Sequence, residues 1–361
     1  MDINGIIVKI YAVYHARTNG GMENMITMVL SVYNTGQYLP KAIDTVLCQT
    51  CGDFEVILVD DGSTDGSAAV CDEQAARSEK IRVFHKPNGG LSSARNFGIE
   101  HAKGDFIIFP DPDDWLEPGY LEGLVAIRQK HNADLSVCGH YFFENGCDHL
   151  WNANGSEEVF GTAQALDRLM QPASFCGYAW NKLYSMEVIR RHGLRFDTEL
   201  GMAQDLHFAF RYLRLCSRVA YDPQLPLYHY NRDTVGVTTY DTPLTPRKIS
   251  GLKTYVKIAA LAHGEYPSVE AEALGVLSDT ALQYIYLYYH FKTKEPQTLA
   301  LLRGYQKQYF SYFLASPSYS RQRKLLGRVA KVSPRLYYLF FQSKRVLFDF
   351  VRRLTGRQRE I

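Results

Sequence analysis

Acidic residues stand directly after apolar runs of the chain, where their carboxylates could bind a phosphorylated ligand. Asp60 and Asp61 begin the acidic and glycine-containing stretch 60–65, which follows the apolar residues 56–59. Asp, Gly and Ser are favoured in turns, and carboxylates also accept hydrogen bonds from a base or a ribose. Residues 60–65 therefore have two interpretations, an ordinary turn and a nucleotide contact.

A second acidic group follows the apolar residues 106–109 and contains Asp111, Asp113 and Asp114. Three acids this close repel one another unless a cation or hydrogen-bond donors compensate them. Mg²⁺ and Mn²⁺ take oxygen ligands and commonly bridge one or two carboxylates to substrate phosphates. The spacing therefore suits a metal diphosphate, and the alternative is an acidic cap on a helix that begins near Pro118.

Two further features lie at expected helix starts. The glycine turn 88–90 precedes a helix that contains Arg95, and such a turn offers backbone N–H groups to an anion while the arginine could reach a phosphate. The alternative is an ordinary capped loop with a solvated arginine. Asp205 follows Gln204 at the start of a later helix, where an acid by itself indicates only a cap.

Short β-rich runs alternate with helical patterns in the first third of the chain. This rhythm is typical of βαβ units and a parallel sheet, whose carboxyl edge would present the polar stretches described above. We expect strands at 26–32, 54–60, 81–85 and 106–109, and helices at 39–47, 67–76 and 92–102. Further along we expect a helix from Pro118, a strand at 135–139, a hairpin region to about 160, helices at 162–170 and 205–215, and only helices beyond about 244.

The composition is that of an ordinary globular protein. The chain has 361 residues, of which 46% are hydrophobic and 22% charged, and this excludes disordered and fibrous classes. No run reaches the roughly 18 apolar residues of a membrane span, and the start lacks a secretory signal, so we expect a cytoplasmic protein. Of the seven cysteines, Cys48 and Cys51 have metal-site spacing without the second pair that zinc requires.

The charge is distributed unevenly along the chain. Residues 318–361 contain 12 Lys and Arg against 2 acids, and aromatic and aliphatic residues alternate with the basic ones. Basic helices with an apolar face bind anionic membrane surfaces, so this pattern predicts peripheral attachment to a membrane. The alternatives are a solvated basic face and nucleic-acid binding, and no nucleic-acid module accompanies the charge.

Taken together in chain order, these motifs resemble the family 2 glycosyltransferases, the inverting group with the GT-A fold that builds bacterial surface polysaccharides. The likeness covers about residues 25–235. The residues that carry it are Ser31-Val32-Tyr33-Asn34, 60–65, 88–96 with Gly98, 111–115, Trp180-Asn181-Lys182-Leu183-Tyr184 and Gln204-Asp205. The resemblance implies an α/β GT-A fold, with a Rossmann-like and mostly parallel sheet flanked by helices and a helical C-terminal region after it.

The resemblance also implies roles for individual residues. Nucleotide binding falls to Val32, Tyr33, Asn34, Asp60, Asp61, Arg95 and Asp111. Asp113 would hold Mn²⁺ or Mg²⁺ on the diphosphate, and Asp205 would be the catalytic base, while Gln204 stands where the family has a glutamate. Trp180, Asp114 and His229 are candidates for acceptor or donor-sugar contacts, and core packing is the alternative for the Trp and the His.

The predicted function is the transfer of one sugar from a nucleotide-diphosphate sugar, with UDP-hexose expected from family frequency, to a saccharide hydroxyl. The acceptor is expected to be lipid-linked, the process to be extracellular or capsular polysaccharide synthesis, and the enzyme to lie on the inner face of the cell membrane. The alternatives are an inactive nucleotide-sugar-binding scaffold and a nucleotidyltransferase. We divide the chain into an N-terminal extension at 1–24, a glycosyltransferase domain at 25–245 and a helical, basic region at 246–361.

Overall fold

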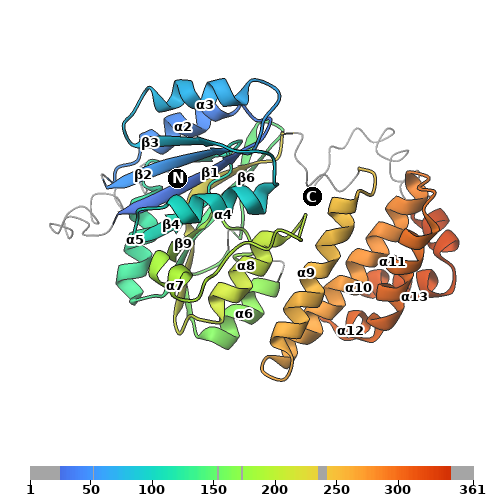
Figure 1. The fold of residues 1–361 in the computed structure, drawn as a ribbon. Helices are drawn as coiled ribbons and strands as arrows, with labels where there is room; N and C mark the ends of the chain where they lie inside the picture. Colours follow the sequence, from blue (N-terminus) through green and yellow to red (C-terminus); the bar gives the residue numbers. More distant parts are fainter. Residues whose placement is uncertain (1–24, 52, 153, 172–173, 235–241, 343–361) are drawn as a thin grey trace.

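The computed structural model describes residues 25–51, 53–152, 154–171, 174–234 and 242–342. The expected extension at 1–24 lies outside these residues. The described chain forms one ten-stranded sheet with helices on both faces, and further helices follow it (Figure 1). This confirms the predicted α/β class with a helical C-terminal region.

The first half of the sheet is parallel and has the strand order β3-β2-β1-β4. Its strands are β1 (Ile26–Val32), β2 (Phe54–Asp60), β3 (Ile81–His85) and β4 (Phe106–Ile108), and its helices are α2 (Leu39–Leu47), α3 (Ser67–Ala75) and α4 (Leu91–His101). The expected elements of this half are thus confirmed, with ends that differ by at most one residue. Because all four strands run the same way, their polar ends meet at one edge of the sheet.

Burial on both faces explains why these strands are continuously apolar. Val29 of β1 packs in one hydrophobic cluster with Ala94 of α4, whereas its neighbour Leu30 packs in a second cluster with Ile43 of α2. Every residue of β2 is buried. The sheet is therefore a rigid support for the loops at its carboxyl edge.

The second half of the sheet mixes strand directions. Strand β9 (Lys182–Ser185) runs antiparallel between β4 and β6 (Leu135–Glu144), and β10 (Val219–Asn231) runs parallel to β6. The remaining elements of this half are β5 (Trp115–Leu116), β7 (Cys147–Leu150), β8 (Glu158–Phe160), α5 (Tyr120–His131), α6 (Thr162–Met170), α7 (Met186–Arg191) and α8 (Gln204–Leu213). The strands β9 and β10 were not predicted from the sequence.

Helices make up the described chain after the sheet. They are α9 (Pro246–Ala262), α10 (Pro267–His290), α11 (Pro296–Gln308), α12 (Phe310–Ala315) and α13 (Arg321–Val332). Thr245 caps α9 by accepting a hydrogen bond from the Lys248 N–H. One hydrophobic cluster extends from the sheet into these helices, so the division near residue 245 stays a prediction. Within the described ranges, no helix combines the length and the apolar character that crossing a membrane requires.

Candidate active site

Asp60 is buried and ionised at the carboxyl end of β2. Its Oδ1 accepts a hydrogen bond from the Ser63 N–H at 3.0 Å, and its Oδ2 lies 3.0 Å from His85 Nδ1. Burial raises the pKa of Asp60, but the hydrogen bonds with Ser63 and His85 outweigh it and lower the pKa below its ordinary value. A carboxylate thus stands ready at the edge where a ligand of such a sheet binds.

Asp61 holds the next loop in place. Its carboxylate accepts hydrogen bonds from the N–H groups of Gly89 and Gly90, at 3.0 and 2.7 Å, and from the Lys86 ammonium at 2.5 Å. Asp61 is 2% exposed. It therefore fixes the glycine turn that opens α4, a role that the sequence had not indicated, and its predicted nucleotide contact stays a prediction.

The loop after β1 is tied to the loop after β2. Val32 pairs in register with Asp60, so the two strands end side by side. Asn34 adopts a left-handed conformation with φ of 53°, and its side-chain oxygen accepts a hydrogen bond from the Thr64 N–H at 2.8 Å. Tyr33 remains 49% exposed at this edge. The loop thus leaves an aromatic ring accessible to a ligand at the end of β1.

Arg95 lies in α4 and is 2% exposed. Its Nη2 donates to Asp111 Oδ1 at 2.9 Å, and its guanidinium carbon lies 5.2 Å from the centre of the Phe196 ring. The Nη1 atom is buried and has no hydrogen-bond partner in the described chain. A buried donor without an acceptor is costly, so Nη1 is suited to an oxygen of an anionic ligand.

Asp113 lies close enough to Asp111 for the negative charge of Asp111 to affect its ionisation. Burial, and next the charge of Asp111, raise the pKa of Asp113 to about 6. The hydroxyl of Thr234 donates to Asp113 Oδ2 at 3.1 Å and partly offsets that rise. Two carboxylates that disfavour each other's ionisation are a natural place for a cation.

Asp114 anchors the end of β10. Its oxygens accept hydrogen bonds from the Tyr228 hydroxyl at 2.6 Å and the Asn231 N–H at 2.8 Å. Burial and the charges of Asp113 and Asp111 hold the pKa of Asp114 well above its usual range. Asp114 is 3% exposed, so the sugar contact predicted for it would require these hydrogen bonds to be replaced.

Asp205 is the second residue of α8 and is half-buried. Ala203, the residue before the helix, has φ of 56° and turns the chain into it. Burial raises the pKa of Asp205 and the positive charge of Arg95 lowers it, while Asp111 and Lys182 are also close enough to act on it. Because Asp111 acts on both Asp113 and Asp205, we call these three carboxylates the acidic cluster.

Lys182 also lies in this region, although the sequence indicates no role for it beyond membership in a motif. The side chain is completely buried, and its ammonium donates to the carbonyls of Cys176 and Tyr178 at 2.8 and 2.7 Å and to Asn181 Oδ1 at 2.8 Å. Burial lowers the pKa of Lys182 to about 7. Lys182 thus holds residues 176–178 beside α8, where Gly177 approaches Leu206 closely.

Trp180 belongs to the hydrophobic core. Its ring is 2% exposed and stacks on Tyr178 and Tyr228, with centroids 4.6 and 4.2 Å apart. The structure therefore favours the packing alternative for Trp180, because a buried ring offers no face to a sugar.

His229 has both ring nitrogens engaged. Nδ1 lies 2.9 Å from Asp148 and Nε2 lies 2.8 Å from Glu117, and the ring stacks on Trp115 and Tyr141. Although burial lowers it, these two carboxylates raise the pKa of His229 overall. Because both ring nitrogens already have carboxylate partners, the structure favours the packing alternative for His229.

The residues of the acidic cluster fit a divalent cation whose remaining ligands come from a substrate. Among the residues that the structure describes, no group of three or more His, Cys, Asp or Glu side chains could hold an ion by itself. Mg²⁺ is commonly bound by one or two carboxylates together with substrate phosphates, and Asp111 and Asp113 supply oxygens of that kind. The raised pKa of Asp113 agrees with such a site, since a bound cation would favour its ionised form.

The sequence is similar to bacterial glycosyltransferases. Residues 27–193 match the family model described as glycosyl transferase family 2. The chain is 33% identical to EpsH of Bacillus subtilis over 57% of its own length and 60% of EpsH, and 32% identical to EpsJ of the same organism over 61% and 65%. It is 32% identical to the glycosyltransferase GlyG of Streptococcus pneumoniae, over 61% of this chain and 75% of GlyG. The chain thus spans less than two thirds of EpsH and EpsJ.

The fold is similar to that of solved glycosyltransferases. S. aureus TarS 1–349, crystallised in complex with UDP-GlcNAc, superposes with a TM-score of 0.61 at 15% identity, over 89% of this chain and 92% of that one. A mannosyltransferase of Pyrobaculum calidifontis in complex with GDP-Man and Mn²⁺ gives a TM-score of 0.54 at 16% identity, over 91% and 95%. At these identities the likeness concerns the fold alone.

Proposed function

We propose that this chain, which belongs to the family 2 glycosyltransferases, moves one sugar from a nucleotide-diphosphate sugar to a saccharide hydroxyl with inversion at the anomeric carbon. The proposal is supported chiefly by the links among Arg95 and the acidic cluster. Arg95 bonds Asp111, the charges of Arg95 and Asp111 act on Asp205, and Asp111 also acts on Asp113. These residues come from three segments of the chain, namely α4, residues 111–113 and α8. These residues supply the two groups that a displacement at a sugar carbon needs. One is a positive charge that stabilises the leaving phosphate, and the other is a base that accepts the proton of the acceptor hydroxyl.

The leaving group is a nucleoside diphosphate, on which negative charge increases as the bond from the anomeric carbon to the phosphate oxygen breaks. Arg95 Nη1 has no acceptor in the described chain and would donate to a phosphate oxygen, while Nη2 keeps its bond to Asp111. A divalent ion held by Asp113, when bound, supplies Lewis-acid neutralisation of the diphosphate. The family resemblance also implies a ribose contact for Asp111, which its 27% exposed side chain permits.

Asp205 would take the proton of the acceptor hydroxyl as the hydroxyl oxygen attacks the anomeric carbon. The new carbon–oxygen bond forms on the side opposite the leaving phosphate, the proton goes to the Asp205 carboxylate, and the configuration inverts. The raised pKa of Asp205, which burial causes against the effect of Arg95, makes it a stronger base than an exposed aspartate. A uridine donor is supported by the crystal of TarS with UDP-GlcNAc, a protein of similar fold.

A donor screen tests the function. UDP-glucose, UDP-galactose, UDP-GlcNAc and GDP-mannose are each incubated with the protein and Mn²⁺, Mg²⁺ or EDTA, and release of the nucleoside diphosphate is measured. We expect metal-dependent release from a UDP-sugar, its loss in Asp113→Asn, and no change in the control Asp53→Asn, an exposed acid before β2. Donor binding without release would favour the scaffold, and a screen with neither would refute the proposal.

We further propose that the C-terminal helices attach the enzyme to the inner face of the cell membrane, where a lipid-linked acceptor would be reached. Leu325 and Val332 of α13 are 58 and 82% exposed, and Leu336 and Leu339 are 57 and 59% exposed. Exposed basic residues stand on the same segments, among them Arg328 and Arg335. Exposed apolar side chains among cations suit an anionic bilayer surface. The basic residues that the sequence places at 344–359 lie outside the described chain.

Vesicle flotation tests the attachment. The full chain is mixed with phosphatidylcholine vesicles, either pure or containing about 30 mol percent phosphatidylglycerol, a lipid that makes the vesicle surface anionic. The double variant Arg328→Glu, Arg335→Glu should float less than the wild type on anionic vesicles. The exposed Leu301→Ser on α11 serves as a control that keeps the charge. Equal flotation of the double variant and the wild type would contradict the attachment.

A further inference from the structure

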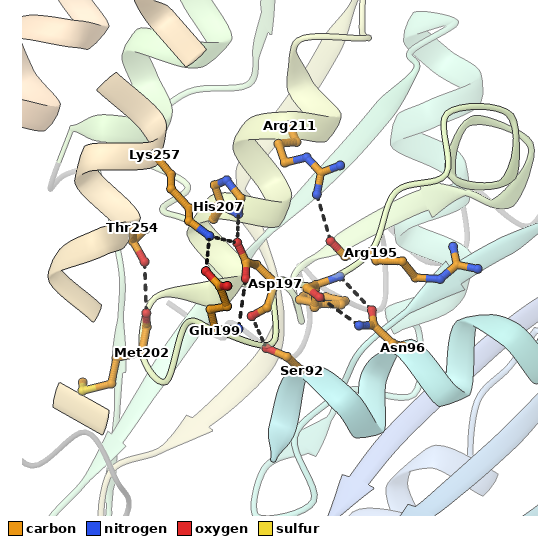
Figure 2. Close-up of polar contacts among 11 residues, drawn as sticks. Ser92, Asn96, Arg195, Asp197, Glu199, Met202, His207, Arg211, Thr254 and Lys257 are labelled. Atoms are coloured by element: carbon orange, nitrogen blue, oxygen red, sulfur yellow. Dashed lines mark hydrogen bonds and ion pairs between the residues drawn. The ribbon is translucent and has the colours of Figure 1, made fainter. Parts of the chain in front are cut away.

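The loop that leads into the helix of Asp205 is held between the sheet domain and the C-terminal helices. This 195–202 loop connects the segment after α7 to the first turn of α8. Figure 2 shows its side chains and carbonyls meeting α4 on one side and α9 on the other. The position of Asp205 thus depends on contacts from two parts of the chain that are far apart in sequence.

The first part of the loop is fixed to α4, the helix that carries Arg95. The Asn96 side chain bonds the backbone of Phe196 twice, accepting from its N–H at 2.7 Å and donating to its carbonyl at 2.8 Å, and the Ser92 hydroxyl donates to the Asp197 carbonyl at 3.0 Å (Figure 2). The Phe196 ring stacks on Phe208 of α8 at 4.1 Å. These bonds set the loop relative to the donor side of the site.

The last part of the loop is fixed to α9. Gly201 donates its N–H to the Ser250 hydroxyl at 2.8 Å and accepts at its carbonyl from Arg247 Nε at 2.8 Å. The Thr254 hydroxyl donates to the Met202 carbonyl at 3.2 Å. Three hydrogen bonds from α9 therefore act on the two residues that precede Ala203 and the start of α8.

Lys257 of α9 adds an ion pair to the middle of the loop. Its ammonium lies 2.5 Å from Asp197 Oδ2 and 3.0 Å from Glu199 Oε2, as Figure 2 shows. His207 Nδ1 of α8 lies 3.9 Å from the same Asp197 oxygen. The Lys257 and Asp197 side chains are 34 and 17% exposed, so the pair is only partly screened by water.

We propose that α9 positions the catalytic base, with Lys257 and Thr254 as positioning residues that hold the 195–202 loop and, through it, Asp205. This rests on the proposed role of Asp205. Neither residue belongs to the acidic cluster, and both act through a backbone that enters α8 by the left-handed turn at Ala203. A shift of about 1 Å at a reacting group can cost on the order of 10²-fold in rate, so a loosened loop lowers turnover without removing a catalytic group.

The test compares variants of two lysines that lie one turn apart on α9. Lys257→Met removes the ion pair at similar length, Lys257→Arg keeps the charge, and Lys253→Met is the control, at an exposed position. In the full chain with Mn²⁺ and UDP-GlcNAc, or whichever nucleotide sugar the donor screen identifies, we expect Lys257→Met to lose about tenfold or more in kcat. The donor KM should stay within about twofold, Lys257→Arg should recover most of the rate, and the control should match the wild type.

Two outcomes would overturn the inference. One is a kcat of Lys257→Met equal to that of Lys253→Met, and the other is a parallel loss of kcat and donor affinity together with a lower Tm, which indicates general destabilisation. Should Lys257→Met fail to fold, Thr254→Val removes a single hydroxyl and is tested in the same way. We then expect a lower kcat with an unchanged donor KM, and a kcat equal to that of Lys253→Met would overturn the inference.

Hydrogen exchange separates this inference from the proposed function. The amides of residues 201–206 should exchange faster in Lys257→Met than in Lys253→Met whether or not any sugar nucleotide is turned over. If the wild type releases no nucleoside diphosphate from any donor, the proposed function fails, and unchanged exchange at 201–206 would refute the positioning by α9 independently.

Discussion

Replacing Asp205 with asparagine should separate donor binding from sugar transfer. The substitution keeps the size of the half-buried side chain and its place at the start of α8, but it removes the carboxylate that would take the acceptor's proton. Loss of a general base typically costs about 10² to 10⁴ in rate, which corresponds to about 3 to 5 kcal/mol of transition-state stabilisation. Donor affinity should be unchanged or slightly higher, because the site loses a negative charge near the place of the diphosphate.

The pH dependence of kcat provides a second test of the same variant. Burial raises the pKa of Asp205 and Arg95 opposes that rise, so the base becomes protonated at a higher pH than an exposed aspartate does. Only the deprotonated base accepts a proton, and kcat of the wild type should therefore fall as the pH falls through this raised pKa. The residual activity of Asp205→Asn should lack the contribution of Asp205 to this acid limb and keep only that of Asp113, whose pKa burial and Asp111 raise to about 6.

The assay is the release of nucleoside diphosphate with saturating donor, from pH 4.5 to 8, with donor affinity measured separately by titration. Glu187→Gln, a change of an exposed acid in the first turn of α7, is the matched control and should behave as the wild type. A kcat of Asp205→Asn within threefold of the wild type would refute Asp205 as the base.

Three other substitutions have defined outcomes. Lys182→Met leaves buried carbonyls without donors and should lower the free energy of unfolding by about 3 kcal/mol or more in a urea titration. Gln204→Glu places a second carboxylate next to Asp205, and this like charge should raise the pKa of Asp205 and move the acid limb of kcat to higher pH. Trp180→Ala should cost about 3 to 5 kcal/mol of stability by differential scanning calorimetry, with donor affinity retained in the folded fraction, because the ring lies in the core.

The parallel half of the sheet could be predicted because each of its strands is an apolar run that ends in turn-forming residues. Strand β2 is buried along its whole length, ends in Asp60 and is followed by Asp61, so both the apolar run and its end are visible in the sequence. Strand β10 is different, since Pro223 and Pro226 interrupt it and its register with β6 shifts between Asp222 and Tyr228. A bulged strand with two prolines has no clear alternation, and only its neighbours in space make it a strand.

Within the candidate site, the two acidic stretches 60–65 and 111–114 could be found from the sequence, but the role of each carboxylate in them could not. Side chains point alternately to the two faces of a strand, but this pattern stops where the strand ends. It therefore does not predict which of two adjacent acids in the following loop faces a ligand. Asp61 and Asp114 bond the backbone of distant segments. The oxygens of Asp60 bond Ser63 and His85, whereas Asp113 accepts a hydrogen bond from Thr234 at Oδ2. Lys182 could not be assigned either, because its acceptors are carbonyls whose direction depends on the left-handed residue Cys176.

The charges of the acidic cluster explain why a cation belongs in the proposed reaction. Asp111, Asp113 and Asp205 bring up to three negative charges together, and Arg95 offsets one of them. A diphosphate adds further negative charge, and like charges interact strongly where water is excluded. The raised pKa of Asp113, due to burial and to Asp111, reveals the same repulsion in the protein alone. Donor and divalent ion should therefore bind cooperatively, each raising the affinity for the other by the same factor, so a titration without metal would understate the affinity of the site for its donor.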